Sequence, residues 1–257
     1  TTYLTNLIAI PEARQVVEFA EGRVSAVTVR AHAGSPLCQH PIESLREHMP
    51  GADIRIISIF RQGELITPEG RTVIQPGDEV VCLAATHEVR RLVRELRERD
   101  KPVRRLMIAG GGNIRLGLAG EIGHLYEVKL IEQTPRRCEY LAAQVPSKTL
   151  VLNGDATDED LLEDENVGDM DLFLALTSDD EDNIMSSLLA KRMGARRVIA
   201  LIGRKSYAEL MEGGRIDIAI SPSEATIGEL LRHVRRGDVV AVHRLPHGVT
   251  EAIEAIA

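Results

Sequence analysis

The sequence predicts an α/β protein that joins a Rossmann-like, doubly wound parallel sheet to a smaller α+β module of order β-α-β-β-β. Its 257 residues exceed one typical domain, so two units are the expected arrangement. Residues 103–235 alternate apolar strands with amphipathic helices, which is typical of a parallel sheet covered on both faces. Residues 24–84 instead show apolar runs of period two divided by turn residues, which indicates a compact β-rich module.

Composition and charge exclude several classes of protein. A hydrophobic fraction of 44% supplies real cores, while a net charge of −8 argues against nucleic acid as the main partner, because phosphate binding needs clustered Lys and Arg. Cys38, Cys82 and Cys138 are too few and too far apart for a disulfide framework or a zinc site, so a reducing cytosol is the expected location. No apolar window approaches the roughly 18 residues of a membrane span. The start TTYLTNL, without methionine, leads us to expect a fragment of a longer chain.

Ahead of the β-rich module, a helix is predicted over Thr5–Phe19, with a break at Pro11. From Arg23 the apolar positions alternate, which predicts a strand through Val29. One short helix and three strands follow, divided by good turn residues: Pro41–His48, Ile54–Phe60, Glu64–Ile66 and Glu79–Ala84. Thr86 is the predicted N-cap of the next helix. The apolar positions of that helix fall at i, i+3, i+4 and i+7, namely Val89, Leu92, Val93 and Leu96.

Strands and helices alternate through the second unit. The predicted strands are 106–109, 126–132, 150–152, 172–176 and 197–202. The predicted helices are 114–122, 137–144, 158–165, 184–193 and 207–211. An open sheet of this kind places its ligands at the carboxyl ends of its strands.

One internal similarity links the two ends of the chain. Gly22–Val27 and Gly237–Val242 resemble each other at a constant offset of 215 residues, and a helix capped by Ser223 or Thr226 is predicted before the second copy. We therefore expect the chain to end just inside a second copy of the module with which it begins.

A glycine loop follows the first strand of the second unit. Gly110, Gly111 and Gly112 lie where that strand passes into a helix, the context in which glycines let the backbone approach a pyrophosphate. Glu132 lies 132 − 112 = 20 residues further on, at the end of the next strand, where a carboxylate accepts hydrogen bonds from ribose hydroxyls and repels an extra phosphate. Arg115 stands where the G-x-G-x-x-G fingerprint has its third glycine. NAD, or an adenine nucleotide with free ribose hydroxyls, is the predicted ligand.

Polar side chains also follow the third and fourth strands of this unit. Asp155 is placed to meet an adenine amino group, and Thr177 and Ser178 to meet phosphate or ribose. The acids of 179–182 have an alternative interpretation, in which they cap the following helix and meet its dipole.

Catalysis has little support in the sequence. A dehydrogenase needs an acid or base beside the nicotinamide and a substrate pocket, and no motif ties the histidines or tyrosines to such a site. His243 and His247 have only a loose metal-ligand spacing, without a Cys or carboxylate partner. We expect neither a catalytic residue nor a metal site.

Several stretches resemble the RCK/KTN family, in particular the cytosolic regulatory subunits of bacterial Trk potassium uptake systems. GGGNI at 110–114, Glu132, GDATDEDLL at 154–162 and the segment 175–202 resemble the second nucleotide-binding N domain of these subunits. SPLCQHPI at 35–42 and GELITPEGRTVIQPGDEVV at 63–81 resemble the ligand-binding C domain. The domain order N-C-N-C implies four parts: 1–21, the end of a first N domain; 22–100, the first C domain; 101–236, the second N domain; and 237–257, the start of a second C domain.

The resemblance implies a regulator that is not an enzyme. Binding of NAD(H), or alternatively ATP/ADP, would rearrange RCK domains and gate an integral membrane potassium channel subunit of the TrkH/TrkG type. A homodimer or a higher RCK assembly, cytoplasmic and peripheral on the inner face of the cell membrane, is implied as well. The alternatives are an NAD-dependent oxidoreductase and a structural assembly domain with a vacant site.

The resemblance also assigns residues to parts of the nucleotide. The phosphates fall to Gly110, Gly111, Gly112, Asn113 and Ile114, the ribose to Glu132, the adenine region to Asp155 and Ala156, the remaining ribose or phosphate to Thr177 and Ser178, and a further phosphate to Arg204. Arg115 is the departure from the family pattern and predicts a weaker or altered site.

Overall fold

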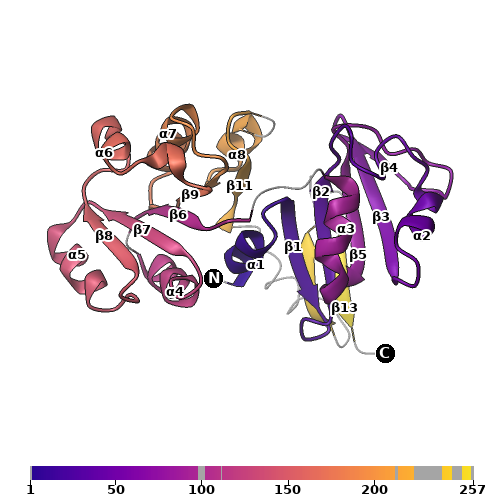
Figure 1. Ribbon diagram of the computed structural model, residues 1–257, viewed down its shortest axis with the longest axis horizontal. Coiled ribbons are helices and arrows are strands. Elements are labelled where there is room, and N and C mark those ends of the chain that lie inside the picture. The colour runs from indigo at the N-terminus through magenta and orange to yellow at the C-terminus, as the bar shows by residue number, and fades with distance from the viewer. Residues whose placement is uncertain are drawn as a thin grey trace. The chain divides into compact units, whose positions relative to one another are not determined.

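The computed structural model describes residues 2–97, 102–110, 112–211, 214–222, 239–244 and 251–255. These residues form two compact units (Figure 1). One contains the described residues of Thr1–Thr5 and Pro102–Glu224, and the other those of Asn6–Lys101 and Ala225–Ala257. Among the described residues, no helix has both the length and the apolar character of a membrane span.

The second of these units is built on a five-stranded antiparallel sheet of order β1-β2-β5-β3-β4. The strands are β1 Ala13–Phe19, β2 Val24–Arg30, β3 Ile54–Arg61, β4 Glu64–Ile66 and β5 Glu79–Ala85. The helices of this unit are η1 Ile42–Ser44, α2 Leu45–His48, η2 Thr86–Glu88 and α3 Val89–Leu96. The predicted strands and the short helix are thus confirmed to within a residue or two.

The apolar stripe predicted for the helix after Thr86 is confirmed. Val89, Leu92, Val93 and Leu96 are all buried at 0–2% exposure on α3. The predicted cap is wrong, because no side chain caps η2. The Thr86 hydroxyl instead lies 2.8 Å from the Ser25 hydroxyl, a hydrogen bond between η2 and β2.

The helix predicted over Thr5–Phe19 is wrong beyond Ala9. Helix α1 covers Thr2–Ala9, and the following residues turn into strand β1. A proline at position 11 disfavours helical backbone at the residue before it. Val16 and Val17 then gain more from pairing with Val27 and Ala26 of β2 than from continuing a short helix. The antiparallel sheet therefore begins before the boundary predicted at residue 22.

The described residues near the C-terminus form a two-stranded hairpin, β12 Val239–Arg244 and β13 Glu251–Ala255. Its register reproduces that of β1 and β2. Val16 pairs with Val27 and Val242 with Ile253, so both partners shift by 226 residues (242 − 16 and 253 − 27). The irregularity between Ala13 and Gln15 recurs between Val239 and Ala241, at the same offset.

The repeat predicted from the sequence is therefore real, but its offset of 215 is wrong. Val24 begins the second strand of the first hairpin, whereas Val239 begins the first strand of the other. The short sequence match Gly-x-Val-x-Ala-Val had therefore aligned β2, the second strand of one hairpin, with β12, the first strand of the other. The helix predicted before this copy, with Ser223 and Thr226 as its possible caps, lies outside the described residues.

The other unit holds a six-stranded parallel sheet of order β11-β10-β9-β6-β7-β8. Its strands are β6 Arg105–Ala109, β7 Glu127–Glu132, β8 Thr149–Asn153, β9 Leu172–Ala175, β10 Val198–Leu201 and β11 Ile218–Ile220. Its helices are α4 Asn113–Ile122, α5 Pro135–Ala142, α6 Glu159–Asp164, η3 Val167–Asp169, α7 Asp180–Arg192 and α8 Lys205–Met211. The doubly wound sheet is confirmed. Within the described part of this unit, the sequence pattern missed two elements of three residues each, η3 and β11.

Apolar clusters cover both faces of this sheet. Ala119 of α4 and Leu141 of α5 pack with Leu130 of β7 in one cluster. Leu162 of α6 and Ala190 of α7 belong to another, together with alternate residues of β6 and β9. Because successive strand residues point to opposite faces, the two clusters explain why the strands read as continuously apolar.

A close approach of two backbones depends on Gly168 in η3. A Cβ atom built there would lie 2.6 Å from the carbonyl oxygen of Met193, a backbone atom that cannot move aside easily. We expect Gly168→Ala to lower the free energy of unfolding by about 1–3 kcal/mol, the usual result of overpacking. Gly120→Ala in α4 is the control: its Cβ meets nothing within 4 Å, so it should stabilise the protein by about 0.5–1 kcal/mol. Denaturant unfolding followed by circular dichroism measures both, and equal effects would contradict the backbone explanation.

Candidate functional site

A pocket of about 410 Å³ opens at the carboxyl ends of four neighbouring strands of the parallel sheet, β6, β7, β8 and β9. The strand after β8 in the chain is β9, which pairs on the opposite side of β6 from β7. The pocket therefore lies at the point where the strand order reverses, the usual ligand site of an open α/β sheet. Its lining comprises Gly110, Gly112, Ile131, Glu132, Gln133, Thr134, Arg137, Gly154, Asp155, Ala156, Thr157, Thr177, Ser178, Asp179 and Asp182.

The glycine loop has the backbone that a close phosphate approach requires. Gly110 has a φ of +99°, a conformation that side chains rarely adopt, and its N–H donates to the Ile131 carbonyl at 2.8 Å. Gly112 is the N-cap of α4 with extended backbone. Gly111 lies outside the described residues, as do the side chains of Asn113, Ile114 and Arg115. The predicted effect of Arg115 accordingly stays a prediction.

Glu132 is held in place at the end of β7. Its Oε1 accepts a hydrogen bond from the Thr134 N–H at 2.8 Å, and its carbonyl accepts one from Asn153 Nδ2 at 3.0 Å. The second bond ties the end of β7 to the end of β8, where Glu132 and Asn153 are paired. The carboxylate thus stands at a fixed position on the pocket wall, beside the glycine loop.

Asp155 and Ala156 form the wall that follows β8. Asp155 Oδ1 accepts from both the N–H and the hydroxyl of Thr157, at 2.8 and 2.7 Å. This local pair of bonds fixes the side chain of Asp155 on the pocket wall, and Ala156, also part of the lining, is buried.

Thr177 and Ser178 line the pocket beyond β9, and Asn183 of α7 holds the backbone of Thr177. Asn183 is 1% exposed. Its Oδ1 accepts from the Thr177 N–H at 2.7 Å, while its Nδ2 donates to the carbonyls of Thr177 and Leu201 at 3.1 and 2.8 Å. One amide therefore joins the ends of β9 and β10. Sequence reasoning did not single out this role, although an Asn six residues after the strand-end Thr is a recognisable signal.

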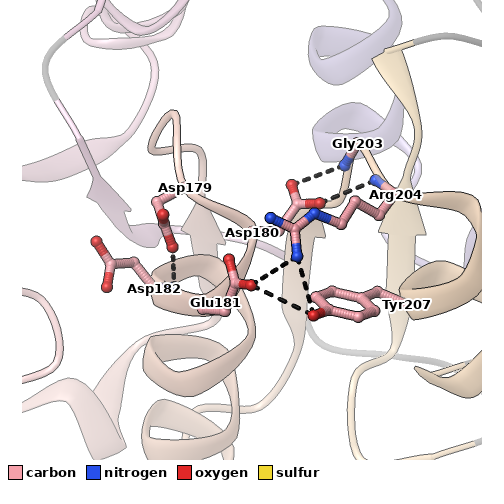
Figure 2. Close-up of polar contacts among 7 residues, drawn as sticks. All are labelled: Asp179, Asp180, Glu181, Asp182, Gly203, Arg204 and Tyr207. Carbon is pink, nitrogen blue, oxygen red and sulfur yellow. Dashed lines mark hydrogen bonds and ion pairs between the residues drawn. The ribbon is translucent and has the colours of Figure 1, made fainter.

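The acidic run 179–182 divides between two tasks, and Figure 2 shows the division. Asp179 caps α7 by accepting from the Asp182 N–H at 3.0 Å, as the capping interpretation predicts, yet Asp179 and Asp182 also line the pocket. Asp180 faces away and accepts from the N–H groups of Gly203 and Arg204, both at 2.8 Å (Figure 2). Because Asp179 caps the helix, α7 begins four residues before the predicted start at Ile184.

The structure does not bring Arg204 into the pocket. Its guanidinium donates to Glu181 Oε1 and to the Tyr207 hydroxyl, both at 2.9 Å, and lies 5.0 Å from the centre of the Tyr207 ring (Figure 2). The side chain expected to reach a phosphate is thus engaged with α7 and α8.

The pocket lining is rich in carboxylates. Glu132, Asp155, Asp179 and Asp182 face a single cationic side chain among the described lining residues, that of Arg137. Burial raises the pKa of the Asp182 carboxyl, and the charges of Asp179, Asp155 and Glu181 raise it further. Phosphates bound here would depend on the backbone N–H groups and the dipole of α4 more than on Lys or Arg. Within the described residues, no group of three or more His, Cys, Asp or Glu is arranged to hold a metal ion.

When β6 is numbered as strand 1 and the sheet is read from β8 to β11, the strand order is 3-2-1-4-5-6. This order, with a glycine loop after the first strand and a carboxylate at the end of the second, defines a dinucleotide-binding class of domain. Comparison with known families identifies a TrkA-N domain at residues 106–222 and a TrkA-C domain at residues 26–97. The chain therefore belongs to the TrkA family.

Curated relatives match the whole chain. It is 51% identical over 257 residues to the Trk system potassium uptake protein TrkA of Vibrio alginolyticus and 50% identical to that of Halomonas elongata. A TrkA homolog of Archaeoglobus fulgidus is 36% identical over 89% of this chain. The chain spans 56% of the length of the Vibrio and Halomonas proteins, about half of each.

Solved structures share the fold. The crystal structure of the GsuK RCK domain superposes with a TM-score of 0.60 at 20% identity, over 90% of this chain and 50% of that one. The GsuK channel bound to NAD superposes with the same TM-score at 19% identity, over 90% of this chain and 42% of that one.

Proposed function

We propose that this chain is part of a nucleotide-sensing regulatory subunit of a potassium transport system. The observation that carries the proposal is the pocket at the reversal of strand order, which combines the Gly110 loop, Glu132 and Thr177 in a TrkA-N domain. The names of the full-length relatives, Trk system potassium uptake proteins, support the potassium system.

NAD(H) is the nucleotide that the pocket favours, with ATP or ADP as the alternative. The fixed carboxylate of Glu132 suits free ribose hydroxyls and repels a 2′-phosphate. Four carboxylates on the wall also disfavour a triphosphate relative to the less charged dinucleotide. The NAD-bound GsuK channel, with the same fold, is consistent with this choice.

A regulatory role is favoured over an oxidoreductase by the chemistry of the pocket. The described lining residues include no His, Lys, Cys or Tyr that could serve as proton donor beside a nicotinamide. A bound nucleotide would act by its difference in affinity between two arrangements of the domains, since equal affinity shifts no equilibrium.

The domain assignment follows the family order and the hairpin repeat. Residues around α1 would close a first N domain, β1 to α3 would form the first C domain, and β6 to β11 the second N domain. The hairpin β12–β13 would open a second C domain, because it repeats β1–β2 in register. The partner would be an integral membrane potassium channel subunit of the TrkH/TrkG type, with the regulator assembled as a homodimer or larger ring on the cytoplasmic face.

Isothermal titration of the chain with NADH, NAD, ADP and ATP tests the proposal, and Glu132→Ala sharpens it. The variant should lose about 10- to 100-fold in affinity for NAD, because hydrogen bonds to a charged group contribute about 1.5–3 kcal/mol. The affinity for NADP relative to NAD should rise as the repulsion disappears.

Glu127→Ala is the matched control for that titration, because Glu127 is an exposed carboxylate at the other end of β7, outside the pocket lining. It should leave every affinity unchanged. If the unsubstituted chain bound none of the four nucleotides, the sensor function would be refuted.

A further inference from the structure

We propose that Arg137 is a base-binding residue of the nucleotide pocket, contacting the adenine ring rather than the phosphates. The inference rests on the proposed function, since it concerns the ligand of the same site. It assigns a role to the one cationic side chain among the described lining residues.

Arg137 is positioned by the same short segment that fixes the ribose carboxylate. Thr134 is the N-cap of α5, with Pro135 in the first turn, and the Arg137 N–H donates to the Thr134 carbonyl at 2.9 Å. The Thr134 N–H in turn holds Glu132. Arg137 is therefore anchored five residues beyond Glu132, on the first turn of the helix that follows β7.

The order of the strands places the segment of Arg137 one strand away from the phosphate loop, on the side that faces β8. The phosphates belong beside Gly110 and Gly112, after β6, and the ribose beside Glu132, after β7. Beyond the ribose the next strand is β8, which pairs with β7 and not with β6. The base then lies between two segments of the pocket wall, the Gln133–Arg137 segment after β7 and the Gly154–Thr157 segment after β8.

The chemistry of this part of the wall suits a heteroaromatic ring. A guanidinium is planar, weakly hydrated and stacks on aromatic faces, which a point charge such as an ammonium does less well. Asp155 of the opposite segment can accept a hydrogen bond from the exocyclic amine of adenine. Together the two side chains provide a stacking surface and a polar edge, with no phosphate needed in the contact.

Titration with a series of ligands that share the base but differ in charge tests this assignment. Arg137→Ala should weaken AMP, ADP and ATP by the same factor, about 5- to 20-fold, because the lost contact is with the base they share. Arg136→Ala is the matched control: the neighbouring exposed arginine of α5 is not part of the pocket lining, and its loss should leave the affinities unchanged.

Three results would overturn the assignment. A loss that grows from AMP to ATP would place Arg137 on the phosphates, and an equal loss in Arg136→Ala would indicate a general effect of charge. Unchanged affinity in Arg137→Ala would remove the residue from the site while leaving the proposed function intact. Failure of the unsubstituted chain to bind NAD and NADH as well as these three ligands would instead contradict the proposed function, and the inference with it.

Discussion

Replacing Arg61 with methionine should lower the free energy of unfolding of the antiparallel unit by about 3–5 kcal/mol, the usual cost of leaving a buried charge without its partner. The Asp78 side chain is only 1% exposed. Its two oxygens accept from Arg61 Nε and Nη2 at 2.9 and 2.8 Å, in a bidentate pair. Methionine keeps the apolar stem of Arg61 but removes both of these hydrogen bonds. Of the three bonds that the Asp78 carboxylate accepts from Arg61 and Gln75, it then keeps one, from the Gln75 N–H at 2.8 Å.

The size of this effect follows from where the pair lies. Arg61 ends β3, and Asp78 lies in the turn before β5, so the pair closes the end of the sheet where β3, β4 and β5 meet. Arg71→Met, an exposed arginine from the loop between β4 and β5, is the control and should cost less than about 0.5 kcal/mol. Denaturant unfolding is best followed by circular dichroism, since the chain has no tryptophan.

A double-mutant cycle separates the pair from its surroundings. With Asp78→Ala as the second change, the double variant should lose less than the sum of the two single losses, by about 1–3 kcal/mol, because each single change already breaks the same pair. Additive losses would mean that Arg61 and Asp78 stabilise the sheet independently, against the geometry of their two hydrogen bonds.

Much of the fold could be predicted from the sequence because its elements have clear hydrophobic periods. The helix α3 is an example, since four apolar residues at helical spacing are the four that become buried. Strand β1 shows where this reasoning stops. Its valines fit a helix or a strand equally well in isolation, and only their pairing with β2, a tertiary contact, decides between them.

The candidate site could be predicted from the sequence where a local motif identifies its residues. A glycine loop after a strand and a carboxylate 20 residues later single out Gly110 and Glu132, and the structure places both on the wall of one pocket, while their contacts with a nucleotide stay a prediction. Arg204 could not be placed from sequence, because Glu181 and Tyr207, which hold its guanidinium, become its neighbours only in the folded unit. Arg137 was missed for a different reason. In the sequence it resembles an ordinary surface arginine of a helix, and only the fold shows that the start of α5 lines the same pocket as Glu132.

Replacing Asn183 with leucine should cost about 3 kcal/mol of stability and at least tenfold in nucleotide affinity. Leucine is close to asparagine in size but leaves three backbone groups without their partner: the Thr177 N–H, the Thr177 carbonyl and the Leu201 carbonyl. Each of these bonds contributes about 1 kcal/mol. Affinity falls as well, because Thr177 lines the pocket and loses the contact that fixes it.

Two further substitutions distinguish this hydrogen-bond bridge from simple packing. Asn183→Asp keeps the shape and the oxygen that faces Thr177 N–H, but sets a second oxygen against two carbonyls, so it should be as damaging as leucine. Ser187→Ala alters another buried position of α7, whose Oγ has no hydrogen-bond partner among the described residues, and should be nearly neutral. A mild effect of Asn183→Asp on unfolding and on NAD titration would contradict the role of the bridge. A strong effect together with an intact Ser187→Ala variant would tie the pocket wall after β9 to this one side chain.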